Sequence, residues 1–342
     1  MKRIAFTLLA LLLLLSACGA GEAAQETTAE TTSSVIETTT SAIETTAEAP
    51  TVPTNGEGTG VKWRTLDLED KANAGVKEWL EESFAAERPQ EYAMGAHKKI
   101  VYRYESSSQL VLVEDGGKET VLLRSEYLGD ETDPEKRKND EVRWRYPGFG
   151  QALNDRYFLV RWQGWEWCSG ISMYDTEELR EIPVEMFQGI ALDSAGIRGG
   201  ALYLRDHIYG GGSGQMHIYA IALDGLDTAK SLAPGKNLLE GIPEADIGET
   251  YHSYDRQIVS PDAKYLAVAE TEFLPESETE ITAVRLFDLT ARSFACRLTS
   301  DSTDVWIRDL AFRDEHTLYA YQTDWDGEKA VIRGHALEIT LP

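Results

Sequence analysis

Two histidines in the stretch "HIYGGGSGQMHIY" have the type and spacing of residues that could share a metal ion. If Gly210 to Gly214 form a hairpin loop, His207 lies directly opposite His217. Cross-strand partners have Cβ atoms about 4.5–5.5 Å apart, which suits two imidazoles on one metal. A zinc site needs three or four protein ligands, and no third ligand is visible near this pair. We therefore expect a solvated histidine pair on a hairpin, with no metal or cofactor.

Three tryptophans in "RWQGWEWCSG" could bind a ligand by stacking. Trp165 and Trp167 alternate with Glu166, so on a strand both indoles face the same way, and Trp162 comes just before them. A row of exposed indoles makes a flat platform for sugar rings or aromatic side chains. The alternative, which we favour, is that these tryptophans fill the space between two packed sheets.

The motifs of common hydrolases are missing from the sequence. There is no Gly-x-Ser-x-Gly elbow and no His-Glu-x-x-His zinc motif. A pair of carboxylates for glycoside hydrolysis stays possible, because Asp and Glu number 58 and spacing in sequence does not give distance in space. The sequence favours a protein that is not an enzyme.

The N-terminus contains a cysteine in a chemically informative setting. Lys2 and Arg3 precede an apolar run of 14 residues, Ile4 to Ala17. A membrane-spanning helix needs about 20 residues, so this run fits the core of a signal peptide, residues 1–17. "LSAC" at its end resembles the lipobox of bacterial lipoproteins. The resemblance implies that Cys18 is acylated, which would anchor the protein at the extracytoplasmic face of the cell membrane.

Residues 18–60 form a segment of different composition. The part after Cys18 has seven Glu, no Lys or Arg, and many Thr, as in "ETTAETTSSVIETTTSAIETT". Such a segment cannot bury enough apolar surface to offset chain entropy, so we expect a disordered, extended tether.

Residues 61–342 are long enough for one sizeable domain. The whole chain has net charge −25; without the two basic residues of the signal and the seven Glu of the tether, −20 remains for this domain. Nucleic acid is therefore excluded as a partner, because phosphate binding depends on cationic side chains. Two cysteines, Cys168 and Cys296, lie far apart in this domain, and we expect two buried thiols rather than a disulfide.

Five stretches of the domain share one order: a polar turn, a strand, a variable loop, and further strands. The first strands of these stretches are spaced by 57, 45, 63 and 52 residues, and their centres are Val101, Phe158, Tyr203, Leu266 and Leu318. Repeats of about 40–50 residues with four short strands are typical of β-propeller blades. A degenerate sixth repeat is conceivable at 240–258. "GVKWRTLDL" at 60–68 is expected to pair with the C-terminal "HALEITLP".

Two of these stretches resemble a known family. "SPDAKYLAVAE" looks like the blade phrase of Tol-type and WD-repeat β-propellers, and "AVRLFDLTARSFACRLT" resembles a WD-repeat third strand with Phe287-Asp288 in place of Trp-Asp. Tyr174-Asp175 in "ISMYDTEELREIPV" occupies the matching position in an earlier repeat. The resemblance implies an all-β propeller of five or six blades, in which the Asp closes a turn and the aromatic packs between sheets.

One segment breaks the β pattern. In "DKANAGVKEWLEESFAAERP", Val76, Trp79, Leu80 and Phe84 follow helical spacing, and Pro89 ends the run. We expect one short amphipathic helix that caps an end of the propeller, with a partner-binding helix as the alternative.

Two functions remain open. The first is a membrane-anchored, extracytoplasmic binding or scaffold lipoprotein that holds an envelope protein or a glycan, through long loops such as 129–141 and 270–281. The second is a glycan hydrolase or lyase with carboxylates in the central channel. Two carboxylates that converge near the axis beside Trp165 would favour the enzyme, and an apolar or basic axis would favour the binding protein.

Overall fold

The computed structural model describes residues 59–86, 91–104, 107–164, 169–185, 192–206, 216–246, 252–274, 279–299, 307–326 and 329–342. The chain divides into two units, Met1–Ala49 and Pro50–Pro342, and every described residue belongs to the second. The predicted signal peptide and nearly all of the predicted tether, including Cys18, therefore lie outside the described residues.

The described strands form five antiparallel sheets, which we number by their order along the chain. Sheet 1 contains β2 (Glu91–Ala93), β3 (Lys98–Tyr104), β4 (Ser108–Glu114) and β5 (Glu119–Arg124). Sheet 2 contains β6 (Glu126–Tyr127), β7 (Trp144–Ala152), β8 (Tyr157–Gly164), β9 (Gly170–Asp175) and β10 (Arg180–Pro183). Sheet 3 contains β11 (Leu192–Arg198), β12 (Ala201–Asp206) and β13 (Ile218–Ala222).

Sheet 4 contains β14 (His252–Val259), β15 (Tyr265–Leu274), β16 (Thr279–Asp288) and β17 (Ser293–Thr299). Sheet 5 contains β18 (Asp309–Phe312), β19 (Thr317–Asp326), β20 (Lys329–Thr340) and the N-terminal strand β1 (Lys62–Asp67). The helices are α2 (Ala74–Ala86), α3 (Pro134–Lys138) and the single 3-10 turns Lys71–Asn73, Glu141–Arg143 and Pro243–Ala245. The described chain is therefore mostly β.

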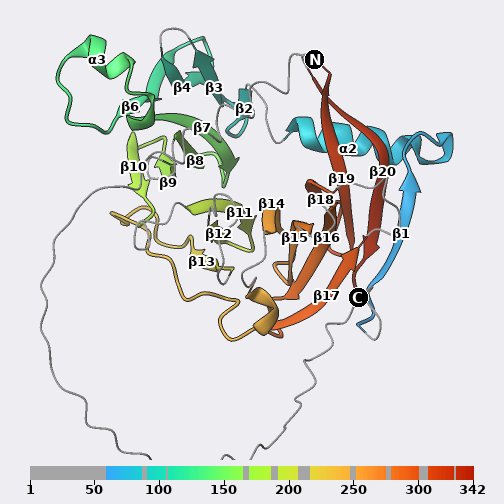
Figure 1. The fold of residues 1–342 in the computed structure, drawn as a ribbon. Helices are drawn as coiled ribbons and strands as arrows, with labels where there is room; N and C mark the ends of the chain where they lie inside the picture. Colours follow the sequence, from blue (N-terminus) through green and yellow to red (C-terminus); the bar gives the residue numbers. More distant parts are fainter. Residues whose placement is uncertain are drawn as a thin grey trace, which may run out of the picture. The chain divides into compact units, whose positions relative to one another are not determined.

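The pairing of the two ends of the domain, expected from the sequence, is confirmed. β1 runs antiparallel to β20, with Lys62 opposite Thr340 and Asp67 opposite His335. Strands from the two ends of the described chain thus lie side by side in sheet 5 (Figure 1).

Each sheet packs face to face on the next because its strands carry apolar side chains on both faces. In β15, Leu266 and Val268 face a core cluster shared with sheet 3, while Ala267 and Ala269 face a cluster shared with sheet 5. Further clusters join sheet 1 to sheet 2 and sheet 2 to sheet 3. Near-continuous apolar runs such as "YLAVA" follow from this two-sided burial.

All five strands expected from the repeat are present, but none is the first strand of its sheet along the chain. Val101, Phe158, Tyr203, Leu266 and Leu318 lie in β3, β8, β12, β15 and β19. The strands before them in sheets 1, 2, 3 and 5, namely β2, β7, β11 and β18, were not recognised in the sequence, and some are as short as Glu91–Ala93. Residues 240–258 supply a 3-10 turn and β14, so their described part adds no sixth sheet.

The two aromatic–aspartate pairs have the structural roles that the resemblance implied. Phe287 is fully buried in the cluster between sheets 3 and 4, and Asp288 closes the following turn by accepting a hydrogen bond from the Ala291 N–H at 2.7 Å. Tyr174 packs between sheets 1 and 2, and Asp175 accepts the N–H groups of Glu177 and Glu178.

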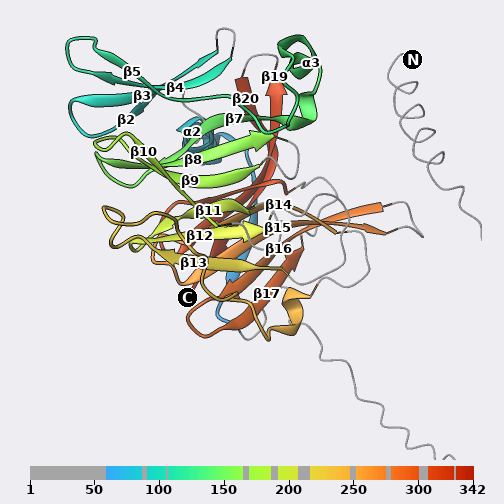
Figure 2. The same ribbon diagram turned by 90° about the vertical axis from the view of Figure 1, so that its left-hand side faces the viewer.

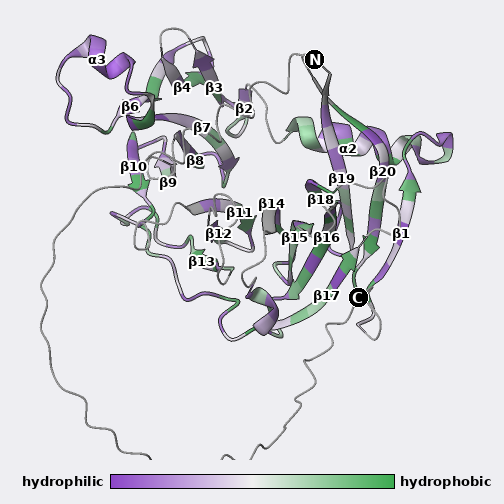
Figure 3. Ribbon diagram, in the orientation of Figure 1, coloured by the Kyte–Doolittle hydropathy of each residue, from purple (hydrophilic) through white to green (hydrophobic). Residues whose placement is uncertain are grey.

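The amphipathic helix near the N-terminus is confirmed as α2, but its position differs from the expected one. Leu80 of α2 is buried against the face of sheet 5 that carries Tyr319, and the Trp79 and Tyr319 ring centroids lie 5.5 Å apart. The helix covers a sheet face instead of capping an end, because the outer face of sheet 5 offers apolar side chains of β1, β19 and β20. Figure 3 shows the contrast with α3, which is hydrophilic.

Candidate functional site

A cavity of about 320 Å³ is lined by described residues from sheets 1, 2, 3 and 4. Its described lining comes from β7, β8, β11 and β14, together with Tyr92 of β2 and the last residue of α2, Ala86. We call this cavity the central pocket. Its volume is at the lower end of the range of small-ligand sites.

Small residues in β7 and β11 leave this space open. Gly150, Ala152, Ala195 and Gly196 all line the central pocket. Gly196 follows a β-bulge after Ser194 and has φ +123°, a conformation that side chains disfavour. A Cβ atom at Gly150 would approach Leu159 Cδ2 to 2.9 Å. Larger residues at these two glycines would therefore strain the strands that form the pocket wall.

Three arginines, Arg161, Arg198 and Arg256, line the central pocket. The Arg161 Nε donates to Asp193 Oδ1 at 3.0 Å, and Arg205 Nη2 lies 2.8 Å from Asp193 Oδ2. Burial by itself raises the pKa of Asp193, but the charges of Arg161 and Arg205 outweigh it and lower the pKa to about 2. Two guanidinium groups thus share one ionised carboxylate, and the trio carries one net positive charge.

Other polar side chains in the pocket wall are held by the backbone of β11 and β14. Arg198 donates to the carbonyls of Val259, at 3.2 Å, and Ile197, at 2.8 Å. Gln151 accepts the N–H of Ile197 through its carboxamide oxygen at 3.0 Å. The Ser194 Oγ accepts the N–H of Gly196. These contacts fix the polar groups in place around the cavity.

An apolar side of the central pocket is formed by aromatic and aliphatic residues. Tyr92 and Phe149 stack on one another, and Phe149 also stacks on the buried Phe158 with ring centroids 5.3 Å apart. Leu159 and Ile258 complete this side. The wall of the pocket therefore combines guanidinium groups with apolar surface. This combination suits an organic anion, because guanidinium groups bind its charge and the apolar surface contacts its carbon atoms.

None of the described residues that line the central pocket is Asp or Glu. Within the described chain there is also no group of three or more His, Cys, Asp or Glu side chains placed to hold a metal ion. The described lining thus offers hydrogen-bond donors and positive charge, without the two carboxylates that glycoside hydrolysis uses.

The tryptophans proposed as a platform fall partly within the described chain. Trp162 is 3% exposed and belongs to the core between sheets 1 and 2. Its Nε1 donates to Glu181 Oε1 at 2.8 Å, and the Arg145 guanidinium lies over its ring. Trp162 is therefore a packing residue and is not part of an exposed platform. Trp165 and Trp167 lie outside the described residues.

The expected histidine pairing is not supported by the strand register. Arg205 lies opposite Ile218, whereas His207 opposite His217 requires Arg205 opposite Tyr219. The register assumed from a symmetric loop is therefore wrong by one residue in the described part of the hairpin. A shift of one residue places side chains that were expected to be paired on opposite faces of the sheet. The His217 ring stacks on Tyr219, and His207 lies outside the described residues.

The two loops suggested for ligand binding differ in character. Residues 129–141 contain α3, whose Asp133 side chain accepts the Glu135 N–H, and its last turn carries Lys136, Arg137 and Lys138. Residues 270–281 belong to the β15–β16 hairpin, which extends further from the sheets than its neighbours in Figure 2. At the base of that hairpin, the fully buried Glu270 is bound by Arg285 and Arg297.

The cysteines are only partly described. Cys296 is a free, fully buried thiol in the core between sheets 4 and 5, and burial raises its pKa to about 12. Cys168 lies outside the described residues. Within the described part of the chain, no helix has the length and apolarity that a membrane span requires.

Sequence reasoning missed the arginines of the central pocket. In β8, Arg161 directly follows the apolar residues "YFLV" and precedes Trp162. A charged side chain in an otherwise apolar part of a strand is the feature from which its role could have been predicted. Arg198 and Arg256 gave no comparable signal, because their neighbours in sequence are polar or mixed and only the convergence of β11 and β14 brings them to one cavity.

Comparisons with known proteins give no family. No family model and no curated protein sequence matches the chain. Among solved structures, prolyl oligopeptidase B from Galerina marginata is similar over 71% of this chain and 33% of its own, with 9% identity and a TM-score of 0.42. Hydrazine synthase from Kuenenia stuttgartiensis is similar over 66% and 58%, with 18% identity and a TM-score of 0.40.

A puromycin-hydrolyzing peptidase from Mycobacterium tuberculosis is similar over 71% of this chain and 37% of its own, with 15% identity and a TM-score of 0.38. The chain thus spans about a third of the length of both peptidases. Likenesses this distant carry no inference about the function of this chain.

Proposed function

We propose that this protein is a membrane-anchored extracytoplasmic lipoprotein that binds a protein or glycan ligand with a β-propeller domain. The short apolar run before Cys18 and the acidic Thr-rich segment after it support the anchor and the tether. The membrane is then one partner, through the lipid, and the ligand at the outer face is the other.

A five-bladed propeller is the fold that we propose for residues 61–342. Five antiparallel sheets that pack face to face in chain order are in keeping with blades. The pairing of β1 with β20 is the kind of contact by which the two ends of a propeller chain close its last blade. Helix α2 takes the outer face of sheet 5, where a neighbouring blade would otherwise pack.

The observation that carries the binding function is the composition of the central pocket. Its described lining contains three arginines and no carboxylate. A pocket with this described lining supports a binding protein over a hydrolase or lyase, which would need an acid and a base in its site.

In-cell photo-cross-linking of the lipidated protein tests this function. One variant carries the photoreactive group at Lys138 in the 129–141 loop, and a matched one carries it at Lys71, which is also exposed. We expect one recurrent envelope protein or glycan from Lys138 and not from Lys71. A C18S variant should leave the membrane fraction and lose that capture. Retention of C18S in the membrane, or equal capture from both positions, would contradict the proposal.

A further inference from the structure

We propose that the central pocket binds an acidic saccharide, that is, a sugar ring that carries a carboxylate group. This inference rests on the proposed binding function and names the class of its ligand. It follows from the charge, the fixed geometry and the shape of the pocket.

Charge distinguishes this pocket from the rest of the protein. The whole chain has a formal net charge of −25, which repels anions from most of its surface. The described lining of the pocket nevertheless has arginine as its only charged residue type. Behind Arg161, the carboxylate of Asp193 is shared with Arg205, so this trio keeps one positive charge next to the cavity. An anion is the ligand that such a site favours.

The guanidinium groups are oriented before a ligand arrives. Arg161 contacts Asp193 Oδ1 through both Nε and Nη2, at 3.0 and 2.9 Å. Arg198 donates to two backbone carbonyls, and these two contacts help to orient its guanidinium group. Planar guanidinium groups match the two oxygens of a carboxylate, and groups held in advance lose less entropy on binding.

The remaining lining suits a sugar ring. Tyr92 and Phe149 stack on one another, and the parts of both side chains that line the pocket give apolar surface for the C–H groups of a sugar ring. Gln151 and Ser194 place polar atoms nearby for hydroxyl groups. A volume of about 320 Å³ admits a small ligand and excludes a folded protein segment.

Isothermal titration of the full lipidated chain in detergent tests the inference, with D-glucuronate, D-glucose and inorganic phosphate as probes. We expect D-glucuronate to bind more tightly than the other two, by about tenfold, because only it offers both a carboxylate and a ring. R256Q and R161Q should weaken D-glucuronate binding about tenfold, and R256K should weaken it less. R64Q, at an arginine that is 67% exposed on β1, is the matched control and should bind normally.

Equal affinity for D-glucose and D-glucuronate would overturn the inference, and so would equal affinity for phosphate. Unchanged D-glucuronate binding by R256Q and R161Q would also overturn it. If R256Q fails to fold, the inference is tested by D-glucuronate binding to R256K and by the affinities of the unaltered protein for the three probes. Capture from Lys138 in cells that persists without any D-glucuronate binding would refute this ligand class and leave the proposed function standing.

Discussion

Trp63 in β1 lies directly opposite Ile339 in β20, so a strand from each end of the described chain is joined in one sheet. Val61, just before β1, is buried in the cluster between sheets 4 and 5, while Leu66 and Leu68 are buried with α2 on the other face. The N-terminal strand therefore contributes to the cores on both sides of sheet 5.

Deletion of residues 1–68 should destabilise the domain, whereas deletion of residues 1–58 should not. The longer deletion removes three buried side chains, each worth about 1.5–3 kcal/mol, so we expect a loss of at least about 4 kcal/mol. Urea denaturation of both proteins measures this. Equal midpoints would show that the β1–β20 contact is not needed for stability.

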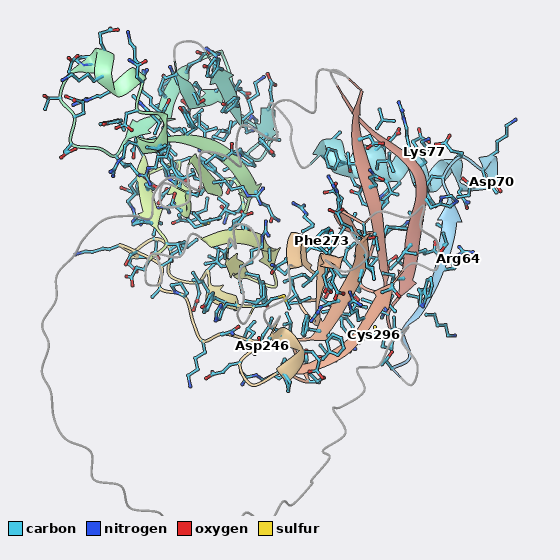
Figure 4. All side chains as sticks on the ribbon, in the orientation of Figure 1. Arg64, Asp70, Lys77, Asp246, Phe273 and Cys296 are labelled. Carbon is cyan, nitrogen blue, oxygen red and sulfur yellow. The ribbon has the colours of Figure 1, made fainter. Side chains whose placement is uncertain are left out.

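Replacement of Phe287 by alanine should cost about 3–5 kcal/mol of unfolding free energy. Phe287 is fully buried between sheets 3 and 4 and packs edge-on against Phe294. The matched control is F273A, because Phe273 lies in the same sheet and is 36% exposed (Figure 4). We expect F273A to lower the free energy of unfolding by less than about 1 kcal/mol. Similar losses for the two variants would contradict the packing role of Phe287.

D175N should weaken the fold at neutral pH and have little effect in strong acid. Burial raises the pKa of Asp175, but hydrogen bonds from Arg156 and from the N–H groups of Glu178 and Glu177 outweigh this and lower it to about 2. A carboxylate with a lowered pKa in the folded state stabilises the fold above its unfolded pKa, about 3.9, and this contribution disappears as the pH falls toward 2.

The wild-type protein and D175N should therefore differ by about 2 kcal/mol at pH 7 and converge between pH 4 and pH 2. Chemical denaturation across this range gives the comparison. A difference that stays constant down to pH 2 would mean that the ionised carboxylate is not what stabilises the turn.

The thiol of Cys296 should resist alkylation in the native protein. Burial raises its pKa to about 12, so hardly any thiolate exists at pH 8, and the side chain is covered by sheets 4 and 5 (Figure 4). Mass spectrometry after iodoacetamide treatment should show Cys296 unmodified until urea unfolds the protein. Rapid native labelling would indicate that the core between these sheets opens readily.

Much of the fold was predictable from the sequence because period-2 patterns and turn residues act locally. The five repeated strands, the aromatic–aspartate pairs and helix α2 were all recognised from short stretches. The pairing of β1 with β20 was predicted from the repeats. Each end of the repeated region has one strand outside the repeats, and the two strands can pair with each other. Short first strands such as β2 and β18 were missed, because three or four residues carry too little pattern.

The candidate site was not predictable in the same way. The sequence favoured burial of Trp162 between two sheets over an exposed platform, and the structure identifies these as sheets 1 and 2. It suggested His207 opposite His217, yet the register of β12 and β13 is set by the apolar faces of Leu202, Leu204 and Ile218 and not by loop symmetry.

By itself, the sequence determined the strand-rich repeat and the acidic balance, which depend on composition and on neighbours along the chain, and it predicts a lipoprotein N-terminus. Only the tertiary structure decided which side chains share a cavity. Arg161, Arg198 and Arg256 are separated by dozens of residues, and they meet because three different sheets bring strands to one place. Distance in space between strands of different sheets is fixed by sheet packing, and no local pattern encodes it.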